Sequence, residues 1–370
     1  MKPPDHPVPS GDRRVAELLV AALQHAGHPV ELASSFQSYE SRGDGARQIA
    51  IMEAGRAEAA RLAADLAARP PALRPALWFT YHVYYKSPDW LGPAVARNLG
   101  IPYVIAEPSY SPKRAAGAFA APFAAAKAAI AGADALFCPT RVDMAALAPI
   151  AAASRLHYLP PFLDPAPYVA ASANRGEIRA ALAAEHRIDP GKVWLVAVGM
   201  MRKRDKLESY RRLAAALHRL PRGAWRLLIA GDGKARGEVR AAFASFGTDV
   251  TMLGALGPEP LARLYAAGDI CVWPAAGEAY GMALLEAQAA GLPVIAGSVG
   301  GVPDVVKDGE TGLLAAAGDA ADFAAKLGGL LDDADRRERF GAAARRFVTG
   351  ERNLDVAAAR LDGVLRALRP

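Results

Sequence analysis

The sequence predicts an α/β protein made of two Rossmann-like, doubly wound domains, each built around a parallel sheet. Short apolar segments that suit buried strands alternate with segments of helical periodicity along the whole chain. A length of 370 residues suits two domains. With 52% apolar and 22% charged residues, the chain has enough apolar surface for two cores and too little charge for a disordered protein.

The apolar segments predict strands in both halves of the chain, with helices between them. The first helix, residues 12–25, ends before Gly27, which suits a left-handed cap, and the second, residues 48–67, ends before Pro70. A last helix covers residues 354–368. The expected strands are residues 29–34, 77–82, 103–107, 136–140 and 157–162 in the first half, and 193–198, 225–230, 250–253, 270–273 and 293–296 in the second.

The two halves are expected to meet at Pro165 and Pro167, because proline continues neither a helix nor a central strand. We therefore expect a first domain over residues 1–163 and a second over residues 164–350. The remaining residues, 351–370, are expected to form a helix that packs back on the first domain.

The first eleven residues carry four prolines, which lack the amide hydrogen that a central strand needs. Either the first sheet lacks its first strand, or the native chain starts upstream of Met1. The same residues have no apolar core of a secretory signal. Cys138 and Cys271 lie far apart in apolar segments, which favours a reducing compartment. These features predict a cytoplasmic protein.

The positive charge of the chain is dispersed. The net charge is +6 and the pI is about 9.3, yet no dense block of Lys and Arg carries the excess. A phosphorylated donor or anionic lipid headgroups would suit this charge, and without a basic stripe interleaved with aromatic residues we expect no nucleic-acid partner. We interpret the alanine-rich residues 115–137 as a helix leading into a strand; a weak peripheral membrane contact is the alternative.

The most informative segment spans residues 273–314. A strand ends at its first residue, a short loop holds Gly277 and Glu278, and a helix begins near Gly281 and ends at Gly291. The amides at a helix N-terminus bind phosphate well. Ligands of open α/β sheets lie beyond the carboxyl ends of the strands, where this loop falls. The segment therefore predicts a phosphate site.

Two carboxylates, Glu278 on the loop and Glu286 more than one turn into the helix, flank this predicted site. A carboxylate on so apolar a helix is costly unless it is hydrogen-bonded, and the hydroxyls of a ribose and a hexose would supply such bonds. The alternative is a structural pair, with Glu278 near a helix start and Glu286 bonded to a neighbouring backbone group. The flanking glycines and aromatic residues favour the ligand.

This segment resembles the donor-site motif of the family-4 glycosyltransferases, or group 1, which have the GT-B fold of two Rossmann-like domains facing a cleft. Residues 250–254, 261–269, 300–303 and 309–313 share the resemblance, which covers about residues 190–350 and is loose in the first half. It implies a retaining enzyme that moves a sugar from a nucleotide-diphosphate sugar. We expect no cofactor.

In that family an Arg and a Lys after the first strand of the second domain hold the donor diphosphate. Here that strand ends at Gly199, and Met200 stands where the family often has Arg, so the resemblance carries the basic roles to Arg202 and Lys206. Cations at a helix N-terminus are unfavourable on their own, and an anionic ligand would explain them. The alternative is a solvated basic cluster.

The resemblance places Glu286 on the nucleotide ribose and Glu278 on the donor sugar. The amides of Tyr280, Gly281 and Met282 are expected near the sugar and phosphate, and no residue is expected to act as a nucleophile.

In the first domain, His82 directly follows an expected strand and is the candidate for contacting the sugar or receiving a proton. The alternative is a surface histidine that bonds a neighbour. Gly11 precedes the first helix and corresponds in position to a family loop that approaches the donor phosphates. Glu107 follows the next strand and is expected to line the acceptor side.

Residues 332–335 contain an Asp-x-Asp match, but they do not follow a strand, and we interpret them as a solvated face. Side-chain cations and helix amides are therefore expected to stabilise the departing diphosphate in place of a metal. The donor stays open between UDP-, GDP- and ADP-sugars, and the acceptor between a glycan, a lipid and a small molecule.

Two alternative functions remain. A catalytically silent nucleotide-sugar-binding or scaffold protein is favoured by Met200 and by the missing strand. A sugar-nucleotide epimerase of the same fold would need acid and base residues that the sequence does not identify.

Overall fold

The structure, a computed structural model, describes residues 11–368. The chain divides into two compact units. The first comprises Met1–Pro160 together with Leu354–Pro370, and the second comprises Pro161–Asn353. The expectation of a missing first strand falls on residues 1–10, which lie outside the described residues.

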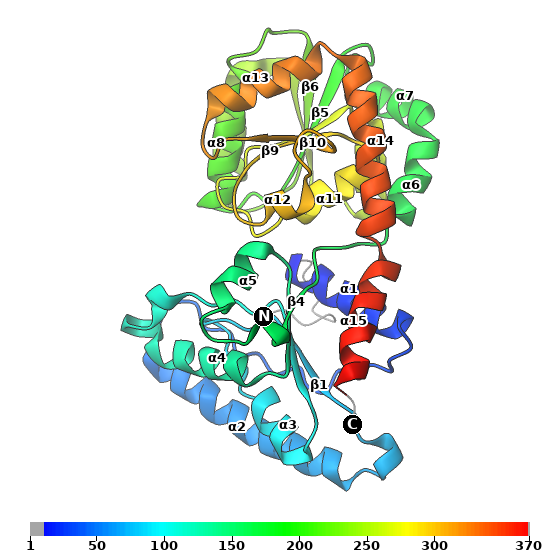
Figure 1. Cartoon of the computed structure of the whole chain (residues 1–370). Coiled ribbons are helices and arrows are strands. Elements are labelled where there is room, and N and C mark those ends of the chain that lie inside the picture. The colour runs from blue at the N-terminus through cyan, green and yellow to red at the C-terminus, as the bar shows by residue number, and fades with distance from the viewer. Residues whose placement is uncertain (1–10, 369–370) are drawn as a thin grey trace. The chain divides into compact units, whose positions relative to one another are not determined.

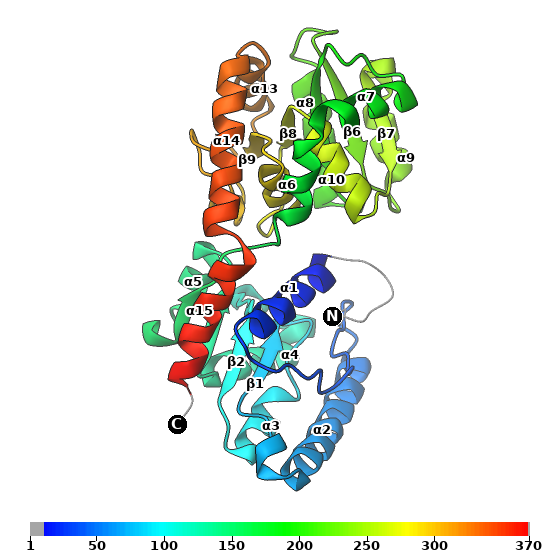
Figure 2. The ribbon, with the colours of Figure 1, turned by 90° about the vertical axis from the view of Figure 1, so that its right-hand side faces the viewer.

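Within the described residues, the first unit has a four-stranded parallel sheet whose strands lie in chain order (Figure 1). Helix α1 packs against α15, so the first and last helices lie side by side (Figure 2), and α2 packs against α3. The strands are β1 (Trp78–Tyr81), β2 (Tyr103–Ala106), β3 (Ala135–Cys138) and β4 (Leu156–Tyr158); the helices are α1 (Gly11–His25), α2 (Gly45–Ala68), α3 (Gly92–Leu99), α4 (Ala120–Gly132), α5 (Arg141–Leu147) and α15 (Leu354–Ala367).

The expected strand at residues 29–34 is wrong: the segment forms neither a strand nor a helix. Pro29 lacks an amide hydrogen for a sheet. The hydroxyl of Ser34 instead donates to the carboxylate of Glu58 on α2, at 2.8 Å, so a side-chain contact replaces a sheet ladder. The left-handed cap expected after α1 is confirmed at Gly27, whose φ is 80°.

Within its described residues, the second unit has a six-stranded parallel sheet in the order β10-β9-β8-β5-β6-β7. The order reverses between β5 and β8, which is the doubly wound arrangement expected from the sequence. The strands are β5 (Val193–Val198), β6 (Trp225–Ala230), β7 (Val250–Gly254), β8 (Ile270–Trp273), β9 (Val294–Gly297) and β10 (Gly312–Ala315).

Helices cover both faces of this second sheet. Helices α8 and α13 pack together on one side, and α6, α10, α11 and α14 lie on the other (Figures 1 and 2). The sheet is therefore buried on both faces, which explains why strands such as β8 read as unbroken apolar runs. The helices are α6 (Ala166–Ala173), α7 (Arg175–His186), α8 (Asp205–Leu217), α9 (Arg236–Ala242), α10 (Pro258–Ala267), α11 (Met282–Ala289), α12 (Val302–Val305), α13 (Ala320–Leu331) and α14 (Ala334–Glu351).

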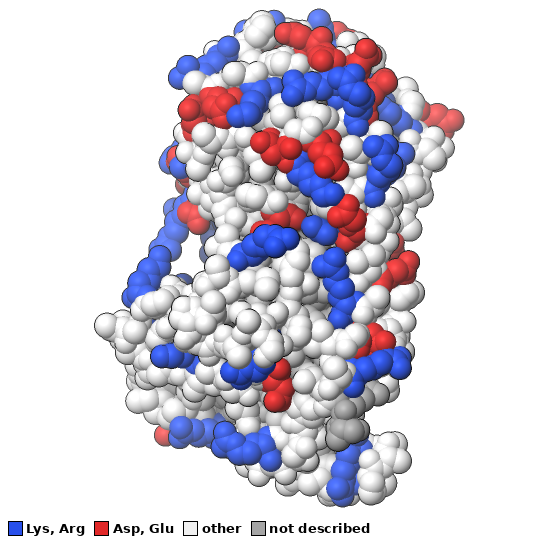
Figure 3. All heavy atoms as spheres, viewed as in Figure 1, with Lys and Arg blue, Asp and Glu red and all other residues white. Residues whose placement is uncertain are grey.

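Strand β10 was not expected from the sequence. Its residues follow shortly after the turn at Gly309, and Gly312, its first residue, is typical of a turn and not of a strand. On the face shown in Figure 3, Lys and Arg are interspersed with Asp and Glu over the second unit. None of the helices in the described part of the chain is both long enough and apolar enough to cross a bilayer.

Candidate functional site

The site predicted in the second unit lies at the carboxyl ends of β5 and β8, where the strand order reverses. Gly199 follows β5, and Trp273 is the last residue of β8. A Cβ at Gly199 would lie 2.9 Å from the Trp273 ring, so only glycine fits beside it. The hydroxyl of Tyr210 on α8 donates to the Gly199 carbonyl at 2.6 Å and fixes the end of β5.

Lys206 and Glu278 form an ion pair at this edge of the sheet. The Lys206 ammonium lies 2.5 Å from a Glu278 carboxylate oxygen, and the indole N–H of Trp273 donates to the same oxygen at 3.0 Å. The side chains of Lys206 and Glu278 are 25% and 13% exposed. The site therefore holds a cation and a carboxylate that solvent still reaches.

The loop between β8 and α11, residues 274–281, is held by backbone and side-chain bonds. The Ala276 amide donates to the Ser209 hydroxyl at 2.9 Å, and the Gly301 amide donates to the Ala279 carbonyl at 2.7 Å. Gly281, with φ of 82°, caps the start of α11. The first amides of a helix have no partner within it, so those of Met282 and its neighbours suit an anion.

Gly300 closes this arrangement from the loop after β9. A Cβ there would lie 2.1 Å from the Glu278 carbonyl oxygen, and φ is +57°. Gly300→Ala is therefore expected to displace the β8–α11 loop and to cost about 1–3 kcal/mol beyond the cost of positive φ itself. Gly309→Ala is the matched control, because φ there is +74° with nothing within 4 Å. Equal losses of stability for the two variants in thermal unfolding would contradict the steric argument.

Glu286 lies on α11, half-buried, and accepts a hydrogen bond from the Tyr265 hydroxyl on α10 at 3.3 Å. Burial, reinforced by the charge of Glu286, raises the pKa of Tyr265 well above its ordinary value. Tyr265 therefore stays protonated and serves as a donor. The sequence predicted that a carboxylate on this apolar helix needs hydrogen bonds, and Tyr265 supplies one of them.

The other predicted residues of this unit differ in how exposed their side chains are. Tyr280 is buried, at 9% exposure, directly before Gly281. Arg202 and Met200 are exposed on the segment between β5 and α8, whereas Lys206 lies in the first turn of α8 and reaches Glu278. The structure thus brings Gly199, Lys206 and Glu278 together and leaves the Arg202 side chain at the surface.

In the first unit, His82 and Glu107 directly follow the neighbouring strands β1 and β2. Both have positive φ, 61° and 56°, a conformation that non-glycine residues adopt at a cost and that clusters at functional sites. The His82 Nδ1 lies 3.6 Å from a Glu107 carboxylate oxygen. Burial lowers the pKa of His82 to about 4, so the ring is neutral at pH 7. Gly11 is the first residue of α1.

The Asp-x-Asp match lies where α13 gives way to α14. Asp333 is the N-cap of α14, and its carboxylate accepts the Arg336 amide at 2.8 Å. Among residues 11–368, no group of three or more His, Cys, Asp and Glu side chains is arranged to hold a metal ion.

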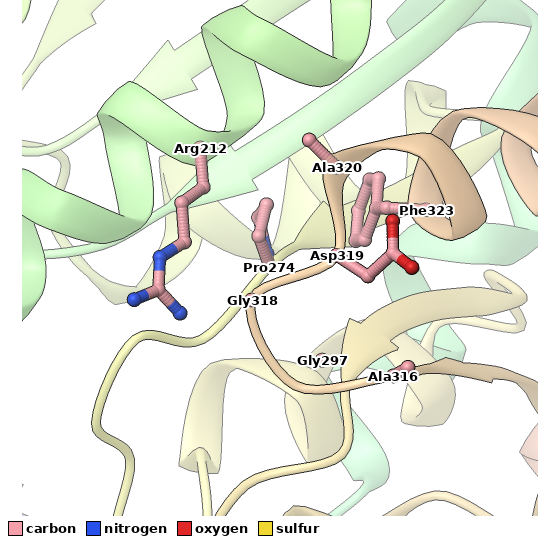
Figure 4. A pocket seen from close by; sticks show the side chains of 8 residues that line it. All are labelled: Arg212, Pro274, Gly297, Ala316, Gly318, Asp319, Ala320 and Phe323. Atoms are coloured by element: carbon pink, nitrogen blue, oxygen red, sulfur yellow. The ribbon is translucent and has the colours of Figure 1, made fainter.

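A small pocket opens beside Pro274 and Gly297, at the carboxyl ends of β8 and β9 (Figure 4). Arg212 of α8 and Asp319 and Phe323 at the start of α13 line it as well. None of the predicted site residues lines this pocket, so we do not assign the candidate site to it.

Sequence reasoning missed Trp273 and Tyr210 as parts of the site. In the sequence, Trp273 appears only as the end of a strand, and Tyr210 lies inside a helix with no motif around it. An indole directly before the Pro274 loop is the signal that points to Trp273, because a tryptophan at a strand end carries an N–H that needs a partner.

Known proteins are similar to this chain mainly in its second unit. Residues 192–333 match the family model described as Glycosyl transferases group 1. The D-inositol 3-phosphate glycosyltransferase of Nocardia farcinica is 36% identical over 204 residues, which are 53% of this chain and 44% of that protein. The chain therefore spans less than half the length of this curated relative.

Solved structures match over both units. Sucrose-phosphate synthase from Thermosynechococcus elongatus has a TM-score of 0.69 and 22% identity, covering 96% of this chain and 92% of the other. Anabaena HepE in complex with UDP-glucose has a TM-score of 0.62 and 17% identity, covering 75% of each chain. The expected resemblance and fold are confirmed: residues 192–333 match the model of the group 1 glycosyltransferases, and the chain has the GT-B fold.

Proposed function

We propose that the chain is a retaining, metal-independent glycosyltransferase that moves a hexose from a nucleotide-diphosphate sugar to an acceptor. One observation carries this proposal. Lys206 and Glu278 lie together at the carboxyl ends of β5 and β8, beside the N-terminus of α11. A cation, helix amides and a carboxylate there match a diphosphate joined to a sugar.

The chemistry follows from charge. When the sugar–phosphate bond breaks, the departing nucleoside diphosphate gains negative charge that must be stabilised. We assign this role to Lys206 and the first amides of α11, supported by Arg202, whose exposed side chain is free to swing toward a bound diphosphate. Gly199 lets the donor approach the end of β5 without a side chain in the way.

The two carboxylates then bind hydroxyl groups. We assign Glu278 to the hydroxyls of the donor sugar and Glu286, held by Tyr265, to those of the ribose. The donor is a UDP-, GDP- or ADP-sugar, and the UDP-glucose bound to the similar HepE chain supports the first of these.

The first unit is proposed to bind the acceptor, a glycan, a lipid or a small molecule. We assign His82, which is neutral at pH 7, to a hydrogen bond with the sugar or the acceptor at the end of β1, and Gly11 to the approach of the donor phosphates. The buried free thiols of Cys138 and Cys271 support a reducing, cytoplasmic location.

Slow hydrolysis of the donor tests the proposal without knowledge of the acceptor. Incubation with UDP-glucose, GDP-mannose and ADP-glucose is expected to release the nucleoside diphosphate from one of them. Excess EDTA is expected to leave that rate unchanged, because Lys206 and the amides carry the compensating charge. A rate that collapses in EDTA and recovers with added Mg²⁺ would contradict metal independence.

The same experiment separates the transferase from a silent binding protein. A donor that raises the melting temperature but releases no diphosphate, even with candidate acceptors present, would favour a scaffold. Once an acceptor is found, NMR of the first-formed product tests retention of the anomeric configuration.

A further inference from the structure

Trp273 contacts three residues of the proposed donor site at once. Its indole N–H donates to Glu278 at 3.0 Å, its ring lies 5.1 Å from the Lys206 ammonium, and its edge packs on Gly199. Tyr210 packs edge-on against the same ring, with centroids 5.1 Å apart. With 3% exposure, the indole is fixed in the core while its N–H reaches the carboxylate.

A second tryptophan of the same sheet shows what a core role alone looks like. Trp225, the first residue of β6, is fully buried, and its indole N–H has no hydrogen-bond partner. Its side chain therefore contributes packing and no hydrogen bond. Trp273, by contrast, donates to a carboxylate whose side chain is still partly exposed.

The ion pair between Lys206 and Glu278 must open for the proposed donor to bind, because a diphosphate takes Lys206 as its own partner. Glu278 would then remain a largely buried carboxylate without its cation, which is costly unless another donor stays with it. The indole N–H of Trp273 lies on a rigid strand end and does not leave. It therefore keeps Glu278 in one orientation as the cation moves away.

We propose that Trp273 is a positioning residue that holds Glu278 for the hydroxyls of the donor sugar after Lys206 has turned to the diphosphate. This inference rests on the proposed function. Trp273 then contributes to the part of the donor's binding free energy that comes from the sugar, and not to the part that comes from the nucleoside diphosphate.

One ratio isolates that part: the dissociation constant of the free diphosphate divided by that of the nucleotide sugar. Calorimetry would measure binding of UDP and UDP-glucose, with GDP and GDP-mannose, and ADP and ADP-glucose, tried in parallel. For the pair that the wild-type protein binds, Trp273→Phe is expected to weaken binding of the nucleotide sugar, relative to the free diphosphate, by about 10- to 100-fold, the usual worth of a hydrogen bond to a charged group. Loss of packing on Gly199 affects both ligands and leaves the ratio unchanged.

Trp225→Phe is the matched control, because it removes an indole from the same sheet without removing a hydrogen bond. It is expected to leave the ratio at the wild-type value. If Trp273→Phe also leaves the ratio at that value, or if Trp225→Phe lowers it equally, the positioning role is overturned. If the wild-type protein binds neither member of any pair, the proposed function itself fails, which is a distinct result.

A double-mutant cycle tests whether Trp273 acts through Glu278. Glu278→Ala is expected to lower the ratio on its own, and adding Trp273→Phe to it is expected to lower the ratio no further, since the acceptor is already gone. Additive effects of the two substitutions would show that Trp273 acts by another route and would overturn the inference.

Discussion

Lys206→Ala is expected to lower the turnover of the proposed transferase by about 10²–10³, which corresponds to about 2.7–4 kcal/mol of lost transition-state stabilisation. Its ammonium is the cation that the structure places at the meeting point of β5 and β8. Charge develops on the diphosphate as the sugar leaves, so the loss should fall mainly on kcat.

Lys203→Ala is the matched control for this prediction. Lys203 lies on the same segment before α8 and is exposed. Steady-state release of the diphosphate should distinguish the two variants, with Lys203→Ala close to wild type. Near-wild-type turnover of Lys206→Ala would remove this lysine from the site. Equal losses for both lysines would point to a diffuse positive field instead.

Glu286→Gln is expected to weaken donor binding by about 10- to 100-fold, because hydrogen bonds to a charged acceptor are worth about 1.5–3 kcal/mol and an amide forms weaker ones. The substitution keeps the size of the side chain and an oxygen that Tyr265 can still reach. The fold should therefore survive, and the loss should appear with the free nucleoside diphosphate as well as with the nucleotide sugar, because the ribose is common to both.

Glu259→Gln, an exposed position in the first turn of α10, is the control for a lost negative charge in the second unit. Calorimetric titration should show wild-type affinity for that variant. Should Glu286→Gln weaken only the nucleotide sugar and leave the diphosphate unaffected, Glu286 would belong with the sugar and not with the ribose.

The sequence was sufficient for features that depend on local pattern. Strands such as β5 and β8 are buried on both sides, so they appear as apolar runs, and α11 is bounded by Gly281 and Gly291, which both have positive φ. Residues 29–34 had the apolar character of a strand but form none, because the pairing that makes a strand is not visible in a local pattern.

The contacts inside the site could not be read from the sequence in the same way. Lys206 and Glu278 are 72 residues apart, and only the strand order brings them within 2.5 Å. The resemblance supplied both residues as separate partners of a ligand, whereas the structure shows them as partners of each other. The Trp273 indole joins them because of how β8 ends, which is a property of the packed sheet.

The Lys206–Glu278 pair also affects which anions can bind at the proposed site. A carboxylate tethered to the same chain competes with any incoming anion at a high effective concentration, typically in the millimolar range or above. Inorganic phosphate or sulfate satisfies the ammonium but offers nothing to the displaced carboxylate. A molecule that carries both a diphosphate and neighbouring hydroxyls satisfies both ends, so we expect the proposed site to bind such a molecule in preference to simple salts.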